Sequence, residues 1–140
     1  MADLDFSSEF GKRVLDRLLH EQINWLTTTS PSGMPQPSPV WFLWDDDSIL
    51  IFSQPNTPKL KAIDRDVSVS LNFNSSESGG DVVVFQGAAE YIESGPRATE
   101  YPVYIEKYAG GMASLGMTAE TFAGSYSEHI RVVPRRMRGH

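Results

Sequence analysis

The chain has 140 residues, of which 40% are hydrophobic and 21% are charged, a balance typical of one globular domain. It contains no cysteine, which excludes thiolate nucleophiles, cysteine-bound zinc and iron–sulfur clusters. Its formal net charge of −6 argues against nucleic acid as the main partner, because phosphate backbones are bound by accumulated Lys and Arg side chains. We therefore expect a single domain over residues 1–140 that folds without a disulfide or a metal.

The sequence predicts neither a membrane span nor a secretion signal. Its longest apolar run, Val40–Trp44, has five residues, whereas a membrane helix needs roughly 20. The first ten residues carry three acidic side chains and lack both the basic start and the apolar stretch of a signal peptide. We expect a soluble, cytoplasmic protein. Its positive charge gathers at the C-terminal end, where four of the last ten residues are arginine, and such a cluster suits a small anionic ligand, a partner subunit or a solvated tail.

In the first half of the chain, apolar periodicity and turn residues predict two helices and three strands. Apolar residues recur about every 3.6 positions over 6–22, as in a surface helix. The turn residues at 30–33 lie between two β-rich runs, which is a hairpin signal. Thr57 and Pro58 are typical of an N-cap and the first position of a helix. The expected elements are a helix over 6–22, strands over 23–29, 36–44 and 48–54, and a short helix over 57–65.

The second half of the chain predicts three more strands and two more helices. Residues 67–73 alternate apolar and polar side chains, as a half-buried strand does. A strand over 81–93 is interrupted at Gly87, where we expect a bulge. Helices are expected over 101–109 and 119–127, a flexible segment over 110–117 and a last strand over 129–134. About six strands with flanking helices indicate an α+β domain built on an antiparallel barrel, and the lack of βαβ units argues against a doubly wound nucleotide fold.

One segment has the pattern of an anion site. A strand ends at Ser53, a turn follows, and a helix starts at Thr57 with Lys59 and Lys61 in its first turns. Free amide groups and the positive end of the helix dipole favour phosphate at such a place. An ordinary helix cap with two solvated lysines explains the same pattern, so both interpretations stay open. The three histidines are scattered without metal-ligand spacing, and no metal ligand is predicted.

The order of these elements resembles the split-barrel flavin-binding superfamily related to pyridoxamine 5′-phosphate oxidase. Its last strand is similar to that of the actinobacterial members that use the deazaflavin coenzyme F420. The resemblance implies an α+β, six-stranded antiparallel split β-barrel that forms a homodimer with two cofactor sites at the subunit interface. The segments that carry it are Trp25-Leu26-Thr27-Thr28, the hairpin at 32–42, Ile51-Phe52-Ser53 with Thr57 and Lys59, and the stretches 63–71, 82–90 and 133–139.

The resemblance also assigns cofactor-binding residues. Those expected along the deazaflavin ring are Gln36, Ser38, Val40 and Trp41. Those expected at the ribityl chain and the phosphate are Phe52, Ser53, Gln54, Thr57, Lys59 and Lys61. Candidates from the second chain are Gln86, Arg135 and Arg136, with Arg138 beside them. No catalytic side chain is assigned, because the coenzyme carries the hydride chemistry.

The resemblance implies an F420-dependent oxidoreductase that transfers hydride to an activated double bond of a small, electron-poor substrate. Pro58 stands where members that bind flavin mononucleotide (FMN) often have Arg, and this departure favours F420, whose longer anionic tail suits Lys61 and the distal arginines. An FMN-dependent oxidase or reductase and a non-catalytic cofactor- or haem-binding protein remain alternatives. Aromatic and Met side chains on amphipathic elements are more often core, so Met112, Tyr126 and His129 are not assigned to a substrate pocket.

Overall fold

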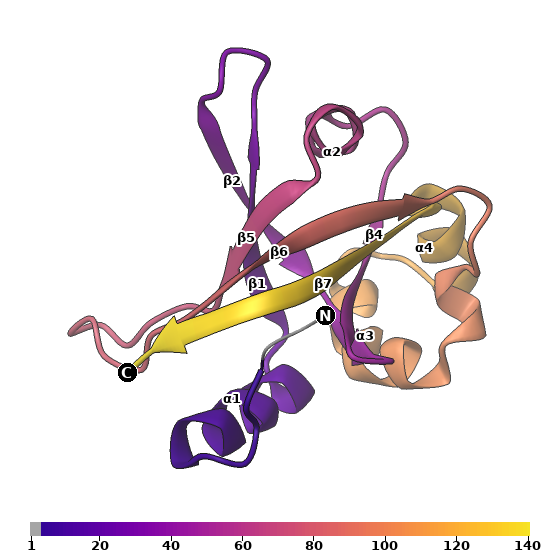
Figure 1. The fold of residues 1–140 in the computed structure, drawn as a ribbon. Coiled ribbons are helices and arrows are strands. Elements are labelled where there is room, and N and C mark those ends of the chain that lie inside the picture. The colour runs from indigo at the N-terminus through magenta and orange to yellow at the C-terminus, as the bar shows by residue number, and fades with distance from the viewer. Residues whose placement is uncertain (1–3) are drawn as a thin grey trace.

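The computed structural model describes residues 4–140, which form one antiparallel sheet flanked by helices (Figure 1). This arrangement confirms the α+β split-barrel prediction. The helices are α1 (Glu9–His20), α2 (Pro58–Arg65), α3 (Pro102–Ser114) and α4 (Ala119–Ser125), with a 3₁₀ turn η1 at Ala98–Glu100. The strands are β1 (Ile23–Thr29), β2 (Pro35–Trp41), β3 (Leu43–Asp45), β4 (Ser48–Ser53), β5 (Ser68–Asn72), β6 (Val83–Ile92) and β7 (Glu128–Gly139).

The sheet curls on itself because one stretch of chain occupies both of its edges. Its strand order is β2-β1-β5-β6-β7-β4-β3, so β2 and β3 lie at opposite edges although only Phe42 separates them in sequence. The Tyr108 hydroxyl accepts a hydrogen bond from the Phe42 N–H at 2.8 Å and lies 2.7 Å from the Phe42 carbonyl oxygen. This tyrosine therefore satisfies the peptide groups where the sheet changes edges. The predicted strand over 36–44 is divided at Phe42, so the described residues form seven strands where six were expected.

The last strand is longer than the residue pattern predicted over 129–134, and it takes the basic C-terminal end into the sheet, as the resemblance over 133–139 implied. Gln86 pairs with Arg136 and Gly87 with Pro134, which leaves Arg135 as the extra residue of a β-bulge. A Cβ atom at Gly87 would lie 2.3 Å from the Val133 carbonyl oxygen, so the close approach of β7 requires glycine. The bulge expected at Gly87 is confirmed. The arginines do not form a loose tail: Arg131, Arg136 and Arg138 pair in register with β6, and Arg135 is the bulged residue of β7.

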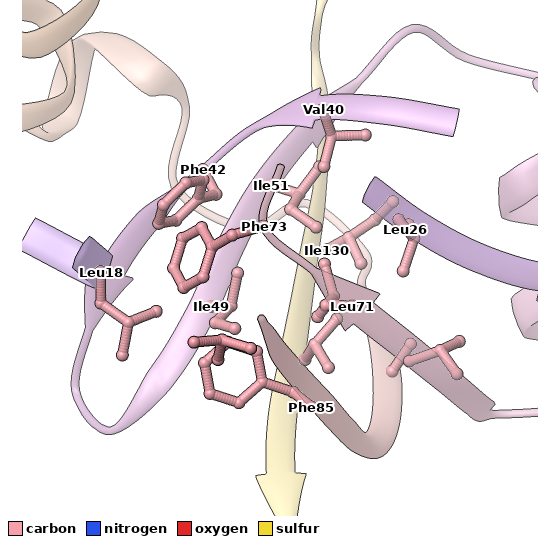
Figure 2. Packing of buried hydrophobic residues seen from close by; sticks show 14 of the residues in the cluster. Leu18, Leu26, Val40, Phe42, Ile49, Ile51, Leu71, Phe73, Phe85 and Ile130 are labelled. Atoms are coloured by element: carbon pink, nitrogen blue, oxygen red, sulfur yellow. The ribbon is translucent and has the colours of Figure 1, made fainter. Parts of the chain in front are cut away.

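Two groups of buried side chains hold the fold together. The barrel interior is filled by aliphatic and phenylalanine side chains from α1, α2 and the strands. Figure 2 shows part of this packing. A second, aromatic cluster joins β4 to α3 and α4, and it includes Phe52, Tyr104, Tyr108 and Phe122. The helical segments after β6 thus pack on the outside of the barrel rather than in its interior. No helix within residues 4–140 is long and apolar enough to span a bilayer.

Helix α3 is longer than expected and includes glycines that were predicted to be flexible. Predicted over 101–109, it runs to Ser114 and contains both Gly110 and Gly111. A Cβ atom at Gly111 would lie 2.7 Å from Cζ2 of Trp41, whereas one at Gly110 would meet no atom within 4 Å. Gly111 therefore lets the Trp41 indole lie directly against α3. Packing against Trp41 therefore explains why Gly111 lies in a helix, although its low helix propensity predicts a loop.

Candidate functional site

A cleft of about 430 Å³ lies between β2, β4, the N-terminal end of α2 and the helices α3 and α4. Strand β4 is buried along its whole length, and its last two residues, Phe52 and Ser53, border the cleft next to α2. Seven of the residues assigned by the resemblance line this cleft: Val40, Trp41, Phe52, Ser53, Gln54, Thr57 and Lys59.

One end of the cleft is polar and is formed where β4 ends and α2 begins. The Ser53 and Thr57 hydroxyl oxygens are 3.1 Å apart. Thr57 is the N-cap residue of α2, but its side chain forms no capping hydrogen bond, and Pro58 follows at the first helical position. The N–H groups of the first turn therefore keep their hydrogen-bonding capacity at the positive end of the helix dipole. This end of the cleft has the donors that an anion requires.

Lys59 adds a positive charge to the polar end. Burial lowers the pKa of its ammonium group, because a charged amine is less stable when it is partly removed from water. No ion pair within residues 4–140 involves Lys59. A half-buried cation without a counter-ion gains more from a bound anion than a solvated lysine does.

The other end of the cleft is aromatic. The Trp41 ring stacks on Tyr108 with centroids 4.6 Å apart, and it lies 5.4 Å from Phe122 at an interplanar angle of 22°. Phe122 in turn stacks on Tyr126 at 4.5 Å and 12°. Tyr104 also borders the cleft, although it is fully buried, and its hydroxyl has no hydrogen-bond partner within the described chain. The cleft therefore combines a polar, cationic end with a flat apolar end.

Three assigned residues near the cleft are outside its lining. Gln36 and Ser38 lie on β2 with Val40, where they pair with Thr28 and Leu26, and Gln36 is exposed. Figure 1 shows the β1–β2 hairpin extending beyond the rest of the sheet. Lys61 is exposed on α2, two residues beyond Lys59.

Gln86, Arg135 and Arg136 lie elsewhere, in a shallow hollow of about 460 Å³ on the outer face of the sheet. Ser70, Gln86 and Arg136 are paired in register across β5, β6 and β7, and they therefore project from one face. Within one chain this hollow is distinct from the cleft. The structure thus brings the assigned residues together in two groups.

The helical wall of the cleft contains residues that were not assigned from the sequence. Tyr104, Leu115 and Phe122 line it, and so does Tyr126, which was weighed and left out. Only the docking of α3 and α4 against β4 separates these side chains from ordinary core residues. The aromatic content of residues 101–126 was the available signal, but no sequence spacing marks which rings face a cleft.

His129 is buried next to the aromatic cluster and does not line the cleft. Its Nδ1 lies 2.8 Å from the Pro96 carbonyl oxygen, and its Nε2 accepts a hydrogen bond from the Arg131 Nε at 3.1 Å. The ring is therefore neutral, with its proton on Nδ1. Burial lowers the pKa of His129, and the nearby Arg131 charge lowers it further, although the Pro96 hydrogen bond opposes the shift. No group of three or more His, Cys, Asp or Glu residues within residues 4–140 is arranged to hold a metal ion.

Comparison with protein families gives a match over residues 10–133 to the family described as pyridoxamine 5′-phosphate oxidase. No curated protein matches the sequence closely enough to count as a relative. The match therefore indicates the family and leaves the individual activity open.

Solved structures with the same fold carry different functions. A conserved hypothetical protein from Mycobacterium tuberculosis is 23% identical, with a TM-score of 0.74 over 99% of this chain and 86% of that one. A structure described as an F420 reductase is 19% identical, with a TM-score of 0.70 over 88% of this chain and 94% of that one. The haem storage protein HutZ from Vibrio cholerae is 11% identical, with a TM-score of 0.65 over 94% of this chain and 95% of that one. At these identities the likeness is one of fold.

Proposed function

The chain belongs to the pyridoxamine 5′-phosphate oxidase family, and on this premise we propose that it is an oxidoreductase that binds the deazaflavin coenzyme F420 in the cleft between β4, α2, α3 and α4. The observation that carries the proposal is the polar end of the cleft, where two neighbouring hydroxyl groups and an unpaired, half-buried lysine surround an uncapped helix start. A structure described as an F420 reductase has the same fold, which supports the choice of coenzyme.

The polar end fits the phosphate of a flavin-like coenzyme. The Ser53 hydroxyl donates to the Gln54 carbonyl oxygen at 2.8 Å and lies 3.1 Å from the Thr57 hydroxyl. The donors that can turn toward an anion are therefore the Thr57 hydroxyl and the backbone N–H groups of the first turn of α2. Lys59 supplies charge without having to give up an existing ion pair. An anion beside Lys59 would also raise its lowered pKa again, because an opposite charge favours the ammonium form. These residues would therefore hold the phosphate and fix the position of the attached ring.

Pro58 and the distribution of positive charge favour F420 over FMN. Pro58 contributes no cationic side chain next to Lys59, which leaves a single lysine for the first phosphate. Lys61 is exposed on α2 two residues beyond Lys59, about half a helical turn further on, and it would meet the longer anionic tail of F420. Arg135 and Arg136 lie on the outer face of the sheet and would meet that tail from a second chain.

We further propose that the working unit is a homodimer in which the outer sheet face of one chain completes the cleft of the other. Ser70, Gln86 and Arg136 form a polar row in register on this face, and the cleft of the same chain contains none of them. The three prolines of β2 have no N–H to offer to a further strand, so pairing across this edge is disfavoured. Association through the outer face of the sheet is consistent with the polar row on that face and with the prolines at the β2 edge.

The chain's own residues perform binding, orientation and exclusion of water. When bound, a reduced deazaflavin supplies a hydride. Val40 and Trp41 would position its ring, and the aromatic wall would keep water away from the transferred hydride. The hydride step needs no acid or base side chain, and the anion that it would leave on the substrate takes up one proton from solvent or from an unassigned side chain.

Haem storage is the competing function, because HutZ shares the fold. The described histidines do not favour it. His129 is buried and bonded on both ring nitrogens, His20 lies on α1 beside Asp16, and His140 is at the end of the chain. None of the three lines the cleft.

Parallel titration of ligand-free protein with oxidised F420, FMN and haem tests the proposal. We expect F420 to bind more tightly than FMN, with an affinity that falls as salt is added, because anionic groups meet Lys and Arg side chains. Lys59→Ala should weaken F420 binding about tenfold or more. Lys12→Ala is the matched control, since Lys12 lies on α1 outside the cleft. Tighter FMN binding would move the protein to the flavin branch, and binding of haem alone would refute an oxidoreductase role.

A further inference from the structure

A second hollow, of about 450 Å³, lies between the C-terminal end of α1, the edge strand β3 and the start of α3. It shares no residue with the cleft, and its size is typical of a pocket for a small molecule. Leu19 and Val103 at its rim are 54% and 64% exposed, although large apolar side chains are usually covered. The apolar residues that line the hollow are Leu18, Leu19, Leu43, Trp44 and Val103. The hollow therefore offers apolar surface that the proposed coenzyme does not cover.

The amino group of Lys107 lies at the wall of this hollow. Its Nζ donates a hydrogen bond to the Phe42 carbonyl oxygen at 3.2 Å and lies 4.0 Å from the centre of the Phe42 ring. No ion pair within residues 4–140 involves Lys107. These contacts hold the amino group in position without giving it a counter-ion.

Burial makes this amine a better nucleophile than a solvated lysine. Partial removal from water lowers the pKa of Lys107 to about 8, although the Glu21 carboxylate opposes the shift. At pH 7 about one in ten of such amines is neutral, which is about 300-fold more than at the ordinary pKa of 10.5. A lysine that is desolvated against apolar side chains is activated in this way for attack on a carbonyl carbon.

The charges around the hollow disfavour a free anion. Glu106 lines it, and Glu21 follows the last residue of α1 as its C-cap. The last carbonyl groups of α1 add the negative end of the helix dipole. The His20 ring also borders the hollow, but its Nδ1 lies 3.0 Å from the Asp16 carboxylate. An uncharged group joined covalently to Lys107 avoids this repulsion and also removes the cost of burying an ammonium group.

We propose that Lys107 is an acylation site that accepts an acyl group from an acyl thioester, and that the hollow receives the apolar acyl chain. The neutral Nζ attacks the thioester carbonyl carbon, a C–N bond forms, the C–S bond breaks, and one proton of the amine leaves with the thiol. The product is an uncharged amide whose remaining N–H keeps a donor for the Phe42 carbonyl oxygen. The site lies outside the cleft and does not depend on the proposed coenzyme.

Two thioesters of N-acetylcysteamine, one acetyl and one octanoyl, test this assignment on the full chain at pH 7.5. Peptide mapping by mass spectrometry gives the acylation rates of Lys107 and of the exposed Lys12 and Lys61. The absence of cysteine excludes acyl transfer through a protein thiol. We expect Lys107 to be octanoylated at least about tenfold faster than either exposed lysine, with an octanoyl-to-acetyl rate ratio about tenfold higher than that of Lys12. Equal rates at the three lysines, or equal rate ratios at Lys107 and Lys12, would overturn the proposal.

Leu19→Ser tests the hollow, because it removes apolar surface from the rim at a side chain that is more than half exposed. Octanoylation of Lys107 should slow by about three- to fivefold, whereas acetylation of the same residue should keep its rate. Met34→Ser is the matched control, since Met34 is 64% exposed and lies between β1 and β2, outside the hollow. An unchanged octanoyl-to-acetyl rate ratio in Leu19→Ser would refute the hollow as the place of the acyl chain.

Discussion

Two adjacent glycines of α3 should respond in opposite directions to the same substitution. Gly110 and Gly111 are both helical, and alanine at an exposed helical glycine stabilises a protein by about 0.5–1 kcal/mol. Gly110→Ala meets no atom within 4 Å, so it should show this gain. Gly111→Ala places a Cβ atom 2.7 Å from Trp41 Cζ2 and 2.9 Å from Cη2, and the displaced indole should cost about 1–3 kcal/mol. The clash should therefore cancel or exceed the gain in helix propensity.

Denaturant unfolding of both variants measures this difference. We expect Gly111→Ala to be less stable than Gly110→Ala by about 1–3 kcal/mol. The tryptophan emission of folded Gly111→Ala should also change, because Trp41 must leave its stacked position on Tyr108. Equal stabilisation by both substitutions with unchanged emission would refute the inference that α3 holds the wall of the cleft.

Three further predictions concern the barrel. Tyr108→Phe should lower the free energy of unfolding by about 1–3 kcal/mol, because it leaves the Phe42 N–H without its partner at the edge of the sheet; denaturant titration measures the loss. Gly87→Ala should destabilise by about 2 kcal/mol or more, because its Cβ meets the backbone of β7; little or no loss would contradict the bulge geometry. The free energy of unfolding should fall as pH drops below the usual His129 pKa of 6.5, since burial lowers that pKa and the unfolded chain takes up the proton more readily; His129→Gln should flatten the dependence between pH 7.5 and 5.5.

The helices and most strands could be predicted from the sequence, but the point at which the chain passes from one edge of the sheet to the other could not. Alternation and turn residues located six of the seven strands of the described chain, because they reflect which side of the sheet each residue faces, and β3 was predicted only as the end of the strand over 36–44. The division at Phe42 depends on the Tyr108 hydroxyl, which comes from a helix 66 residues further along the chain. The extension of β7 depends on pairing with β6, and the Arg-rich sequence alone resembles a solvated tail.

The polar end of the candidate site could be predicted, whereas at its aromatic end Trp41 was assigned and the rings of the helical wall were not. Ser53, Thr57 and Lys59 lie close together in sequence around a strand-to-helix turn, so local rules bring them together. Phe122 and Tyr126 come from a helix whose position is set by packing on β4 and α3. The spacing of these aromatic residues is the same in a core helix and in the wall of a cleft, so the sequence does not distinguish the two.

Coenzyme binding in the cleft depends most directly on phosphate recognition by Lys59 and its neighbours. The decisive measurement compares the affinities of FMN and riboflavin, which differ by one phosphate, in the wild type and in Lys59→Ala, with Lys12→Ala as control. We expect the phosphate to strengthen binding about tenfold or more in the wild type and in the control, and most of this advantage to be lost in Lys59→Ala. Equal affinity of the two ligands for the wild type, or a phosphate advantage that Lys59→Ala retains, would contradict the assignment of the polar end as the coenzyme site.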